Sequence, residues 1–427
     1  MDASSSKRIA IFIYQYGLGN SPALINTGKI LARYGYLVDY FTFNTFIGNF
    51  DFHDASIRII PLSEKEITDR KASASFSNTI PLFIRSRLGY LVSGLYRVKE
   101  ILLDRMFSSQ RIVSLKRSLT EAIDAYVKRA DGIIGASRYS CFIGAEPGGL
   151  IAASILGDKH KVPVVYYSLE LWLSDEITML RDKVLKDMEK KYNKSAAFTI
   201  TLDEERSVLL AHGNGIPLSS IVTVPVCADG PKYGQKGDFF RKKFKLPERA
   251  RIILYAGFIA EWAMCEEMAR AALGWPQNRI LVLHTHGYNE QSYLEKISKY
   301  EGAQVKISRE PVSYEELPSL LASADIGIAL YRDLGKNFNL LGSASGKLSH
   351  YLKSGLPVIA NNYPSIREII NRYNCGICID DVSQIAGAVE KIINNYDVMH
   401  QNAFVCYEDN YMLSKHFNKV LERLKNL

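Results

Sequence analysis

The stretch 344–368, ASGKLSHYLKSGLPVIANNYPSIRE, decides how the second half of this chain is interpreted. A turn rich in Ser and Gly leads into Lys347 at the start of a predicted helix, which carries an apolar stripe at i, i+3 and i+4 spacing. Gly355 ends that helix, and the apolar run 356–360 predicts a short buried strand. A helix that leads directly into a buried strand is typical of an α/β domain with a parallel sheet.

The start of this helix combines several groups that suit a phosphate. Free backbone N–H groups, the hydroxyls of Ser343 and Ser345, the small Gly346 and the ammonium of Lys347 are expected in one place. His350 follows three residues later and could hydrogen-bond a ribose or a phosphate. A histidine on a half-buried helix is as often satisfied by its neighbours, so both interpretations of His350 stay open.

The same stretch resembles the nucleotide-sugar half of GT-B glycosyltransferases, where a Lys…Tyr…Ala-Gly-x-Pro-Val-Ile…Glu pattern stands at this point. Ser354 replaces the alanine, and Glu368 matches the last glutamate of the pattern. The resemblance implies an α/β fold of two Rossmann-like, doubly wound domains with an interdomain cleft. It also implies transfer of a sugar from a nucleotide-sugar to an acceptor, with the nucleotide base near Arg309 and Val312 of the second domain.

The resemblance is to the glycosyltransferase group 1, or family 4-like, superfamily. The chain departs from the common retaining enzymes of that superfamily. Those enzymes place Gly-Arg after the first strand of the second domain and a Lys soon after, whereas here Gly257 is followed by Phe258. At the positions of their two sugar- and ribose-contacting glutamates stand Gly342 and His350. We therefore expect Lys347 and the helix N–H groups to replace the missing cations and to stabilise the departing diphosphate.

Length and composition indicate two soluble domains. The 427 residues exceed one ordinary core, 47% of them are apolar, and no apolar run is long enough for a membrane span. Short apolar strands, including one at 132–135, alternate with helical segments. We predict an acceptor-binding domain at 1–225, a linker at 226–250, a nucleotide-sugar-binding domain at 251–400, and a C-terminal helix at 401–427 that crosses back to the first domain.

A glycine loop follows the first predicted strand, 8–13, and precedes a helix. Gly17, Gly19 and Asn20 would let the backbone approach an acceptor or a diphosphate, and a plain tight turn is the alternative. The loop lacks the full G-x-G-x-x-G spacing, and Asn44 stands where a dinucleotide ribose would need an acid. A nicotinamide cofactor is therefore not expected.

Two glutamates stand at predicted strand ends of the first domain, where open α/β sheets bind ligands. Glu146 begins a Gly-rich turn and is our candidate for the catalytic base that an inverting mechanism needs, whereas a retaining mechanism needs none. Glu170 ends the next strand and is expected to bind the acceptor. The alternatives are helix capping for Glu146 and an exposed or satisfied side chain for Glu170.

The charge of the chain favours anionic partners, since the net charge is +8. Between Arg85 and Arg117 there are eight Lys or Arg residues against two acids, interleaved with aliphatic and aromatic residues. This helical, basic segment, 77–130, suits the surface of an anionic membrane; a helix pair packed on the first domain is the alternative. We expect a cytoplasmic protein, peripheral on the inner face of the cell membrane, with a lipid-linked acceptor in surface polysaccharide assembly, and no nucleic-acid partner.

The cysteines favour ordinary buried thiols. Cys375 and Cys378 form a single C-x-x-C pair, which a zinc site would have to complete with His400 and Cys406. A redox pair would lie at a helix start rather than in a predicted strand. We expect no metal and no cofactor other than the nucleotide-sugar as co-substrate.

Two other functions remain open at this point. A GT-B epimerase would turn over the nucleotide-sugar without an acceptor and would not bind membranes. A partner subunit that kept the fold and lost activity is the second alternative, because the usual Arg/Lys and Glu pairs are missing. Donor hydrolysis by the purified chain would separate that partner from the enzymes.

Overall fold

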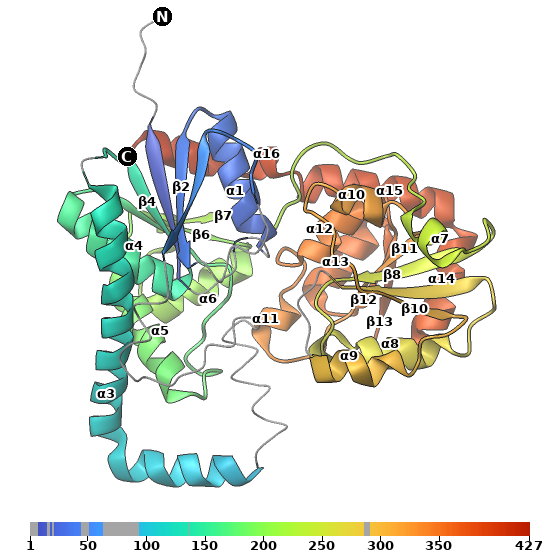
Figure 1. Ribbon diagram of the computed structural model, residues 1–427, viewed down its shortest axis with the longest axis horizontal. Helices are drawn as coiled ribbons and strands as arrows, with labels where there is room; N and C mark the ends of the chain where they lie inside the picture. The colour runs from blue at the N-terminus through green and yellow to red at the C-terminus, as the bar shows by residue number, and fades with distance from the viewer. Residues whose placement is uncertain are drawn as a thin grey trace, which may run out of the picture. The chain divides into compact units, whose positions relative to one another are not determined.

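The computed structural model describes residues 7–14, 18, 21–43, 51–62, 94–135, 137–285 and 291–427. The chain divides into two compact units. Unit 1 comprises Met1–Val224 together with Phe417–Leu427, and unit 2 comprises Pro225–His416. Each unit is built on one parallel sheet with helices packed against it (Figure 1).

The sheet of unit 1 has seven parallel strands in the order β3-β2-β1-β4-β5-β6-β7. Its strands are β1 (Arg8–Ile13), β2 (Leu37–Phe43), β3 (Ile57–Leu62), β4 (Cys141–Ala145), β5 (Val164–Tyr167), β6 (Phe198–Thr201) and β7 (Ile221–Thr223). The central strands β1, β4 and β5 are almost completely buried. Burial on both faces explains why they consist of continuous apolar runs rather than alternating ones.

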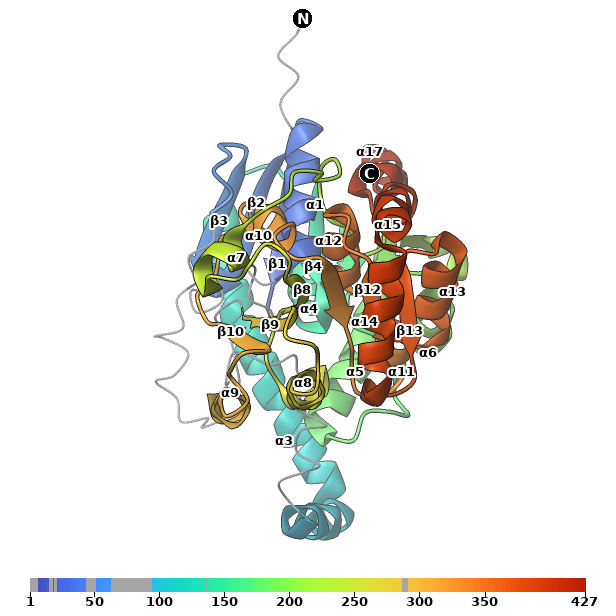
Figure 2. The same ribbon diagram turned by 90° about the vertical axis from the view of Figure 1, so that its right-hand side faces the viewer.

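The described helices of unit 1 are α1 (Pro22–Arg33), α3 (Gly94–Ile134), α4 (Glu146–His160), α5 (Leu180–Asn193), α6 (Glu204–Asn214) and α17 (Asn418–Lys425). Helix α3 packs against α4 and α5, and its first part extends away from the sheet of unit 1 (Figures 1 and 2). The predicted strand at 132–135 is wrong, because 132–134 form the last turn of α3. A four-residue apolar run does not distinguish a strand from the buried face of a helix.

The strand order of unit 1 reverses between β1 and β4. Ligands of doubly wound sheets bind at this switch point, beyond the carboxyl ends of the strands. Helix α4 begins directly after β4 and lies very close to β1. A Cβ atom at Gly149 would stand 2.3 Å from the carbonyl oxygen of Phe12, so only glycine allows this approach.

The sheet of unit 2 has six parallel strands in the order β10-β9-β8-β11-β12-β13. Its strands are β8 (Arg251–Ala256), β9 (Arg279–His284), β10 (Val305–Ser308), β11 (Ile326–Ala329), β12 (Val358–Asn361) and β13 (Gly376–Ile379). The order reverses between β8 and β11, which is the switch point of this sheet.

The described helices of unit 2 are α7 (Phe239–Phe244), α8 (Cys265–Ala272), α9 (Gln291–Ser298), α10 (Leu317–Leu321), α11 (Lys336–Asn339), α12 (Gly346–Lys353), α13 (Pro364–Tyr373), α14 (Ile385–Asn394), α15 (Tyr396–Asn410) and α16 (Leu413–His416). Helices α13 and α14 both pack against β13 (Figure 2). The predicted crossing segment 401–427 is divided: α15 packs on α12 and α13 in unit 2, and only α17 belongs to unit 1.

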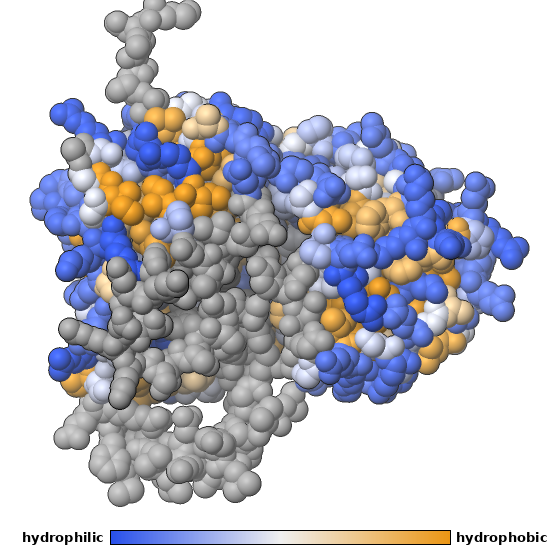
Figure 3. All heavy atoms as spheres, in the orientation of Figure 1, coloured by the Kyte–Doolittle hydropathy of each residue, from blue (hydrophilic) through white to orange (hydrophobic). Residues whose placement is uncertain are grey.

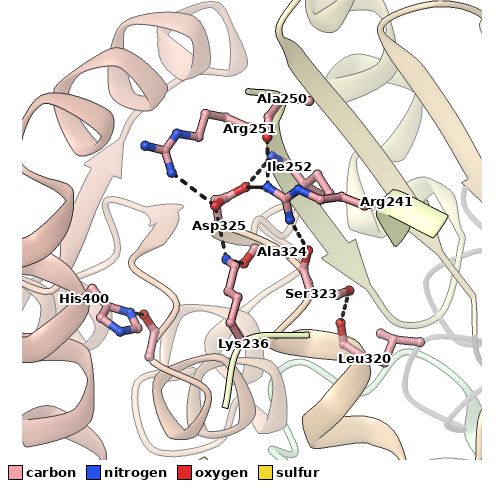
Figure 4. Close-up of polar contacts among 11 residues, drawn as sticks. Lys236, Arg241, Ala250, Arg251, Ile252, Leu320, Ser323, Ala324, Asp325 and His400 are labelled. Carbon is pink, nitrogen blue, oxygen red and sulfur yellow. Dashed lines mark hydrogen bonds and ion pairs between the residues drawn. The ribbon is translucent and has the colours of Figure 1, made fainter. Parts of the chain in front are cut away.

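The range 226–250, predicted to be a linker, belongs to unit 2 and contains α7. The buried carboxylate of Asp325, just before β11, binds this range to the sheet of unit 2. Lys236 and Arg241 from this range, and Arg251 at the start of β8, bind Asp325 at 3.2, 3.2 and 3.3 Å (Figure 4). The backbone N–H of Ile252 donates a fourth hydrogen bond to Asp325, at 2.8 Å. This cluster lies at the amino ends of β8 and β11, so it faces away from the ligand-binding edge of that sheet.

The described surface is largely hydrophilic on the face shown in Figure 3, with smaller apolar areas on both units. Among the described residues, no helix is both long enough and apolar enough to cross a membrane.

Candidate functional site

Lys347 lies at the switch point of unit 2. It is the second residue of α12, and its ammonium group contacts one residue within β8, one that follows β8 and one that follows β11. These are the two strands at which the order reverses. In the part of the chain that the structure describes, Lys347 forms no hydrogen bond or ion pair through its side chain. A half-buried cation without a counter-ion at this edge is the central feature of the candidate site.

Three aromatic rings surround the ammonium of Lys347. The distances from Nζ to the ring centroids are 5.1 Å for Tyr255, 5.5 Å for Trp262 and 5.1 Å for Tyr331. These distances are those of cation–π contacts. Trp262 stacks parallel to Tyr331, with 6.1 Å between the ring centroids, and the two rings form one continuous wall. We call Tyr255, Trp262 and Tyr331 the aromatic box.

Burial in this box lowers the pKa of Lys347 to about 8, because an ammonium loses hydration there, and the neighbouring Cys265 thiol opposes the change only in part. The ammonium group is thus charged at neutral pH, and it contacts aromatic rings in place of water. An anionic ligand would supply the counter-charge that the box does not provide.

The residues expected beside Lys347 are in contact with it or with its helix. Ser345 caps α12 through its hydroxyl, which accepts a bond from the N–H of Leu348 and lies 2.8 Å from the hydroxyl of Tyr331. The N–H groups of Gly346 and Lys347 have no acceptor among the described residues. Gly257, after β8, has a φ of 154°, and a Cβ atom there would stand 2.6 Å from Cε of Lys347. Gly257 therefore makes room for the lysine.

His350 lies one turn further along α12 and is buried. Its Nε2 lies 3.4 Å from the hydroxyl of Tyr314, and its Nδ1 has no hydrogen-bond partner among the described residues. Burial lowers the pKa of His350 to about 3, so the ring is neutral. The contact of His350 is with Tyr314, whereas Lys347 contacts the aromatic box.

The other predicted donor residues have different surroundings. Ser343 accepts a bond from the N–H of Val226 through its carbonyl oxygen. Arg309, after β10, binds Glu301 at 2.8 Å, and the half-buried Val312 follows it. Strand β9 lies between β10 and β8, so two strand spacings separate β10 from β8. Arg309, which follows β10, is therefore roughly 10 Å across the sheet from β8, where Lys347 lies.

Glu368 lies on the exposed part of α13. Its side chain is 66% exposed and forms an ion pair with Arg372, one turn later on the same helix. The structure therefore does not bring Glu368 into contact with Lys347 or with the aromatic box.

In unit 1, Glu146 lies at the other switch point, directly after β4. The residue is 1% exposed and has a φ of 60°. Burial raises the pKa of its carboxyl to about 8, and the neighbouring Glu170 contributes to the rise, whereas hydrogen bonds from Glu170, Trp172 and Leu169 oppose it.

Glu170 follows β5, the strand beside β4. Its side chain is partly exposed, and burial of the carboxyl raises its pKa, while the guanidinium of Arg206 acts in the opposite direction. Glu146 and Glu170 are in direct contact, because the N–H of Glu170 donates to Oε1 of Glu146. The structure thus brings the two predicted carboxylates of unit 1 together.

Several predictions fall on residues outside the description. Gly17, Gly19 and Asn20 are among them, and so is the part of segment 77–130 before residue 94. The side chains of 94–111 are likewise not described. Across the described ranges, no group of three metal-ligating side chains occurs, and all six cysteines are free thiols.

Sequence reasoning missed the aromatic box and its neighbour Arg332. Tyr331 and Arg332 follow the short buried strand β11 after one intervening residue, and Trp262 lies in the turn after β8. Arg332 forms an ion pair with Glu267, and its backbone N–H donates a hydrogen bond to the carbonyl oxygen of Trp262. The position of these residues after switch-point strands was the available signal, because side chains there are more often ligand contacts than core.

Comparison with known families identifies the second part of the chain. Residues 254–409 match the family model described as "Glucosyltransferase 3-like, C-terminal domain". The matched range contains β8 to β13, the aromatic box and Lys347. No curated protein sequence matches the chain.

Solved structures with the same architecture cover almost the whole chain. HepE of Anabaena, in complex with UDP-glucose, is 13% identical with a TM-score of 0.66 and covers 98% of this chain and 100% of its own. Sucrose-phosphate synthase of Thermosynechococcus elongatus is 15% identical with a TM-score of 0.69, over 98% of both chains. WaaG, a glycosyltransferase involved in lipopolysaccharide biosynthesis, is 14% identical with a TM-score of 0.60, over 95% of this chain and 97% of its own.

These likenesses establish the fold, and the family match establishes the class of the second unit. The predicted fold of two doubly wound α/β domains is confirmed by the two parallel sheets and by their neighbours among solved structures. The chain is a glycosyltransferase with the GT-B fold, and its second unit carries a glucosyltransferase 3-like C-terminal domain.

Proposed function

We propose that the chain transfers glucose from UDP-glucose to a hydroxyl group of an acceptor, with unit 2 binding the donor and unit 1 the acceptor. The observation that carries the donor site is Lys347, a cation without a counter-ion in an aromatic box at the switch point of unit 2. The choice of UDP-glucose is supported by the UDP-glucose complex of HepE and by the glucosyltransferase 3-like domain.

The chemistry needs charge stabilisation at the departing diphosphate. When the bond between the sugar and the diphosphate breaks, the leaving oxygen gains negative charge. In this proposal the Lys347 ammonium and the free N–H groups of Gly346 and Lys347 receive that charge. The acceptor binds at the carboxyl ends of the strands of unit 1, where Glu146 and Glu170 lie.

Calorimetric titration with UDP tests the donor site. Lys347→Met should weaken UDP binding by about 1.5–3 kcal/mol, since it removes a charge-assisted hydrogen bond. Lys353→Met is the matched control, because Lys353 lies on the same helix but donates to the carbonyl oxygen of Asp229. Equal UDP affinity of wild type and Lys347→Met would contradict the assignment.

The proposal also requires UDP release from UDP-glucose to continue after dialysis against EDTA, because cationic side chains neutralise the diphosphate.

We further propose a lipid-linked acceptor at an anionic membrane surface, as in surface polysaccharide assembly on the cytoplasmic side. The support is the sequence between Arg85 and Arg117, with eight cations and two anions. Each surface cation near such a membrane contributes on the order of 1 kcal/mol, screened by salt.

Liposome co-sedimentation tests the membrane proposal. Replacing Arg85, Arg87, Arg97 and Lys99 by Ser should abolish binding to anionic liposomes at physiological salt and leave UDP affinity unchanged, because the donor site lies in unit 2. Neutral liposomes serve as the control. If wild type and variant are recovered equally with both kinds of liposome, the acceptor is not recognised at a membrane.

A further inference from the structure

The carboxylate of Glu146 is engaged with a single loop of unit 1. Oε1 accepts hydrogen bonds from the backbone N–H groups of Leu169 at 2.7 Å and Glu170 at 2.9 Å. Oε2 accepts one from the indole N–H of Trp172 at 3.0 Å. All three donors lie in the loop that follows β5, which we call the β5 loop (168–172). Glu146 thus connects the start of α4 to the β5 loop.

This arrangement does not suit a group that removes a proton from a substrate. A general base needs a lone pair within hydrogen-bond reach of the substrate hydroxyl. Here N–H donors occupy both carboxylate oxygens of Glu146, and the residue is 1% exposed. The arrangement does suit a positioning residue, because three hydrogen bonds fix the backbone of two successive loop residues and the Trp172 ring.

Glu170 has the properties that Glu146 lacks. Its side chain is partly exposed and makes no hydrogen bond or ion pair with any other described residue. Its backbone, in contrast, is held on both sides: the N–H by Glu146, and the carbonyl oxygen by the hydroxyl of Ser168 at 3.1 Å. A free carboxylate on a fixed backbone is what a catalytic base requires.

The position of Glu170 in the sheet supports the same role. Strands β4 and β5 are neighbours, and β4 borders the switch point of unit 1. Glu170 therefore stands on the edge where doubly wound sheets bind ligands. The partly buried setting that raises the pKa of its carboxyl also makes it a stronger base than an exposed glutamate.

We propose that Glu170 takes the proton of the acceptor hydroxyl, and that Glu146 is the positioning residue that holds Glu170 in place. This inference rests on the glycosyl transfer proposed above. The O–H bond of the acceptor breaks and its proton passes to the Glu170 carboxylate. The acceptor oxygen forms a bond to the anomeric carbon, and the bond from that carbon to the diphosphate breaks with its electron pair on the diphosphate. The anomeric carbon is inverted.

The test uses the full chain with UDP-glucose as donor and water as acceptor, and it follows UDP release from pH 5 to 9. Glu170→Gln should lower kcat by about 100-fold, the scale of a lost general base, and should abolish the acid limb of the pH profile. Glu146→Gln loses at least one of three hydrogen bonds, because a carboxamide has one acceptor oxygen. It should keep the acid limb with a shifted midpoint and lose less than tenfold in kcat. Asp175→Asn, further along the same loop region, is the matched control and should behave as wild type.

Thermal unfolding of each variant shows that it is folded, and NMR of the first glucose released gives the anomer, which should be β. If Glu170→Gln keeps its acid limb and stays within threefold of wild type, Glu170 is not the base. If Glu146→Gln loses the acid limb instead, the roles are reversed, and release of α-glucose would exclude a single inverting step. If wild type neither binds nor turns over UDP-glucose, the proposed function falls and this inference with it. If wild type turns over UDP-glucose and Glu170→Gln turns it over equally well, this inference fails and the proposed function stands.

Discussion

At the scale of single residues, Lys347 shows what a missing counter-ion does to a side chain. Its pKa is lowered to about 8 because the aromatic box gives an ammonium less stabilisation than water does. A diphosphate would restore the lost stabilisation and favour the charged form. Donor binding by this site should therefore depend on pH in a range where most lysines do not titrate.

We expect UDP affinity to fall by about tenfold between pH 7 and pH 9, since only the ammonium form of Lys347 attracts the diphosphate and its pKa is about 8. The sign follows from the direction of the shift. Below pH 8 Lys347 is mostly charged and the UDP affinity is constant. Above pH 8 the fraction of Lys347 that is charged falls tenfold with each pH unit, and the affinity falls with it. Calorimetry across this range measures the effect. Lys347→Met should show the weaker affinity throughout without this dependence, and an equally steep loss in that variant would assign the effect to another group.

The sequence predicted Lys347, Ser345 and Gly257 as neighbours of one ligand, and the structure places these three together. That was possible because a Ser-x-Lys at a helix start and a glycine after a strand are local patterns. The aromatic box could not be predicted in the same way. Tyr255, Trp262 and Tyr331 lie up to 76 residues apart, and only the pairing of β8 with β11 brings them together.

At the scale of elements, the buried carboxylate of Asp325 decides where the segment before β8 is placed. It gathers Lys236, Arg241 and Arg251 around one carboxyl group. Composition alone favoured a linker, because a segment rich in Gly, Pro and charge resembles an exposed one. The ion pairs depend on an acid more than 70 residues away, which composition does not reveal.

Asp325→Asn should lower the free energy of unfolding of unit 2 by about 3 kcal/mol, because it removes the buried carboxylate that compensates the half-buried guanidinium groups of Arg241 and Arg251. Denaturant unfolding measures the change. The matched control is Asp238→Asn, which breaks the exposed ion pair to Lys242 on α7 and should cost about 0.5 kcal/mol. Equal costs for the two variants would mean that the Asp325 cluster is no more than a set of surface ion pairs.

At the scale of the whole molecule, the alternation of buried strands and helices was enough to predict two doubly wound units. Parallel strands buried on both faces have continuous apolar runs that a single sequence reveals. The sequence predicted that a C-terminal helix at 401–427 crosses back to the first domain, whereas only Phe417–Leu427 belong to unit 1. Helix α17 is amphipathic and α15 is not, but neither pattern says which sheet a helix packs on, and only tertiary packing places α15 in unit 2 and α17 in unit 1.

Leu421, on α17, tests the membership of that helix in unit 1. Leu421→Ala should destabilise unit 1 by about 3 kcal/mol, the cost of a buried leucine. UDP affinity should stay unchanged, because the donor site is in unit 2. The exposed neighbour Glu422 provides the control, since Glu422→Ala should alter neither quantity. A loss of UDP affinity in Leu421→Ala would show that the stability of α17 is coupled to unit 2.

The discontinuity of unit 1 has a consequence for how the protein is made. Unit 2 is continuous from Pro225 to His416, whereas unit 1 needs Phe417–Leu427 in addition to its first 224 residues. During synthesis from the amino terminus, unit 1 therefore cannot be completed until the whole of unit 2 has been translated. The nascent unit 1 must keep its place for α17 uncovered while unit 2 is being made.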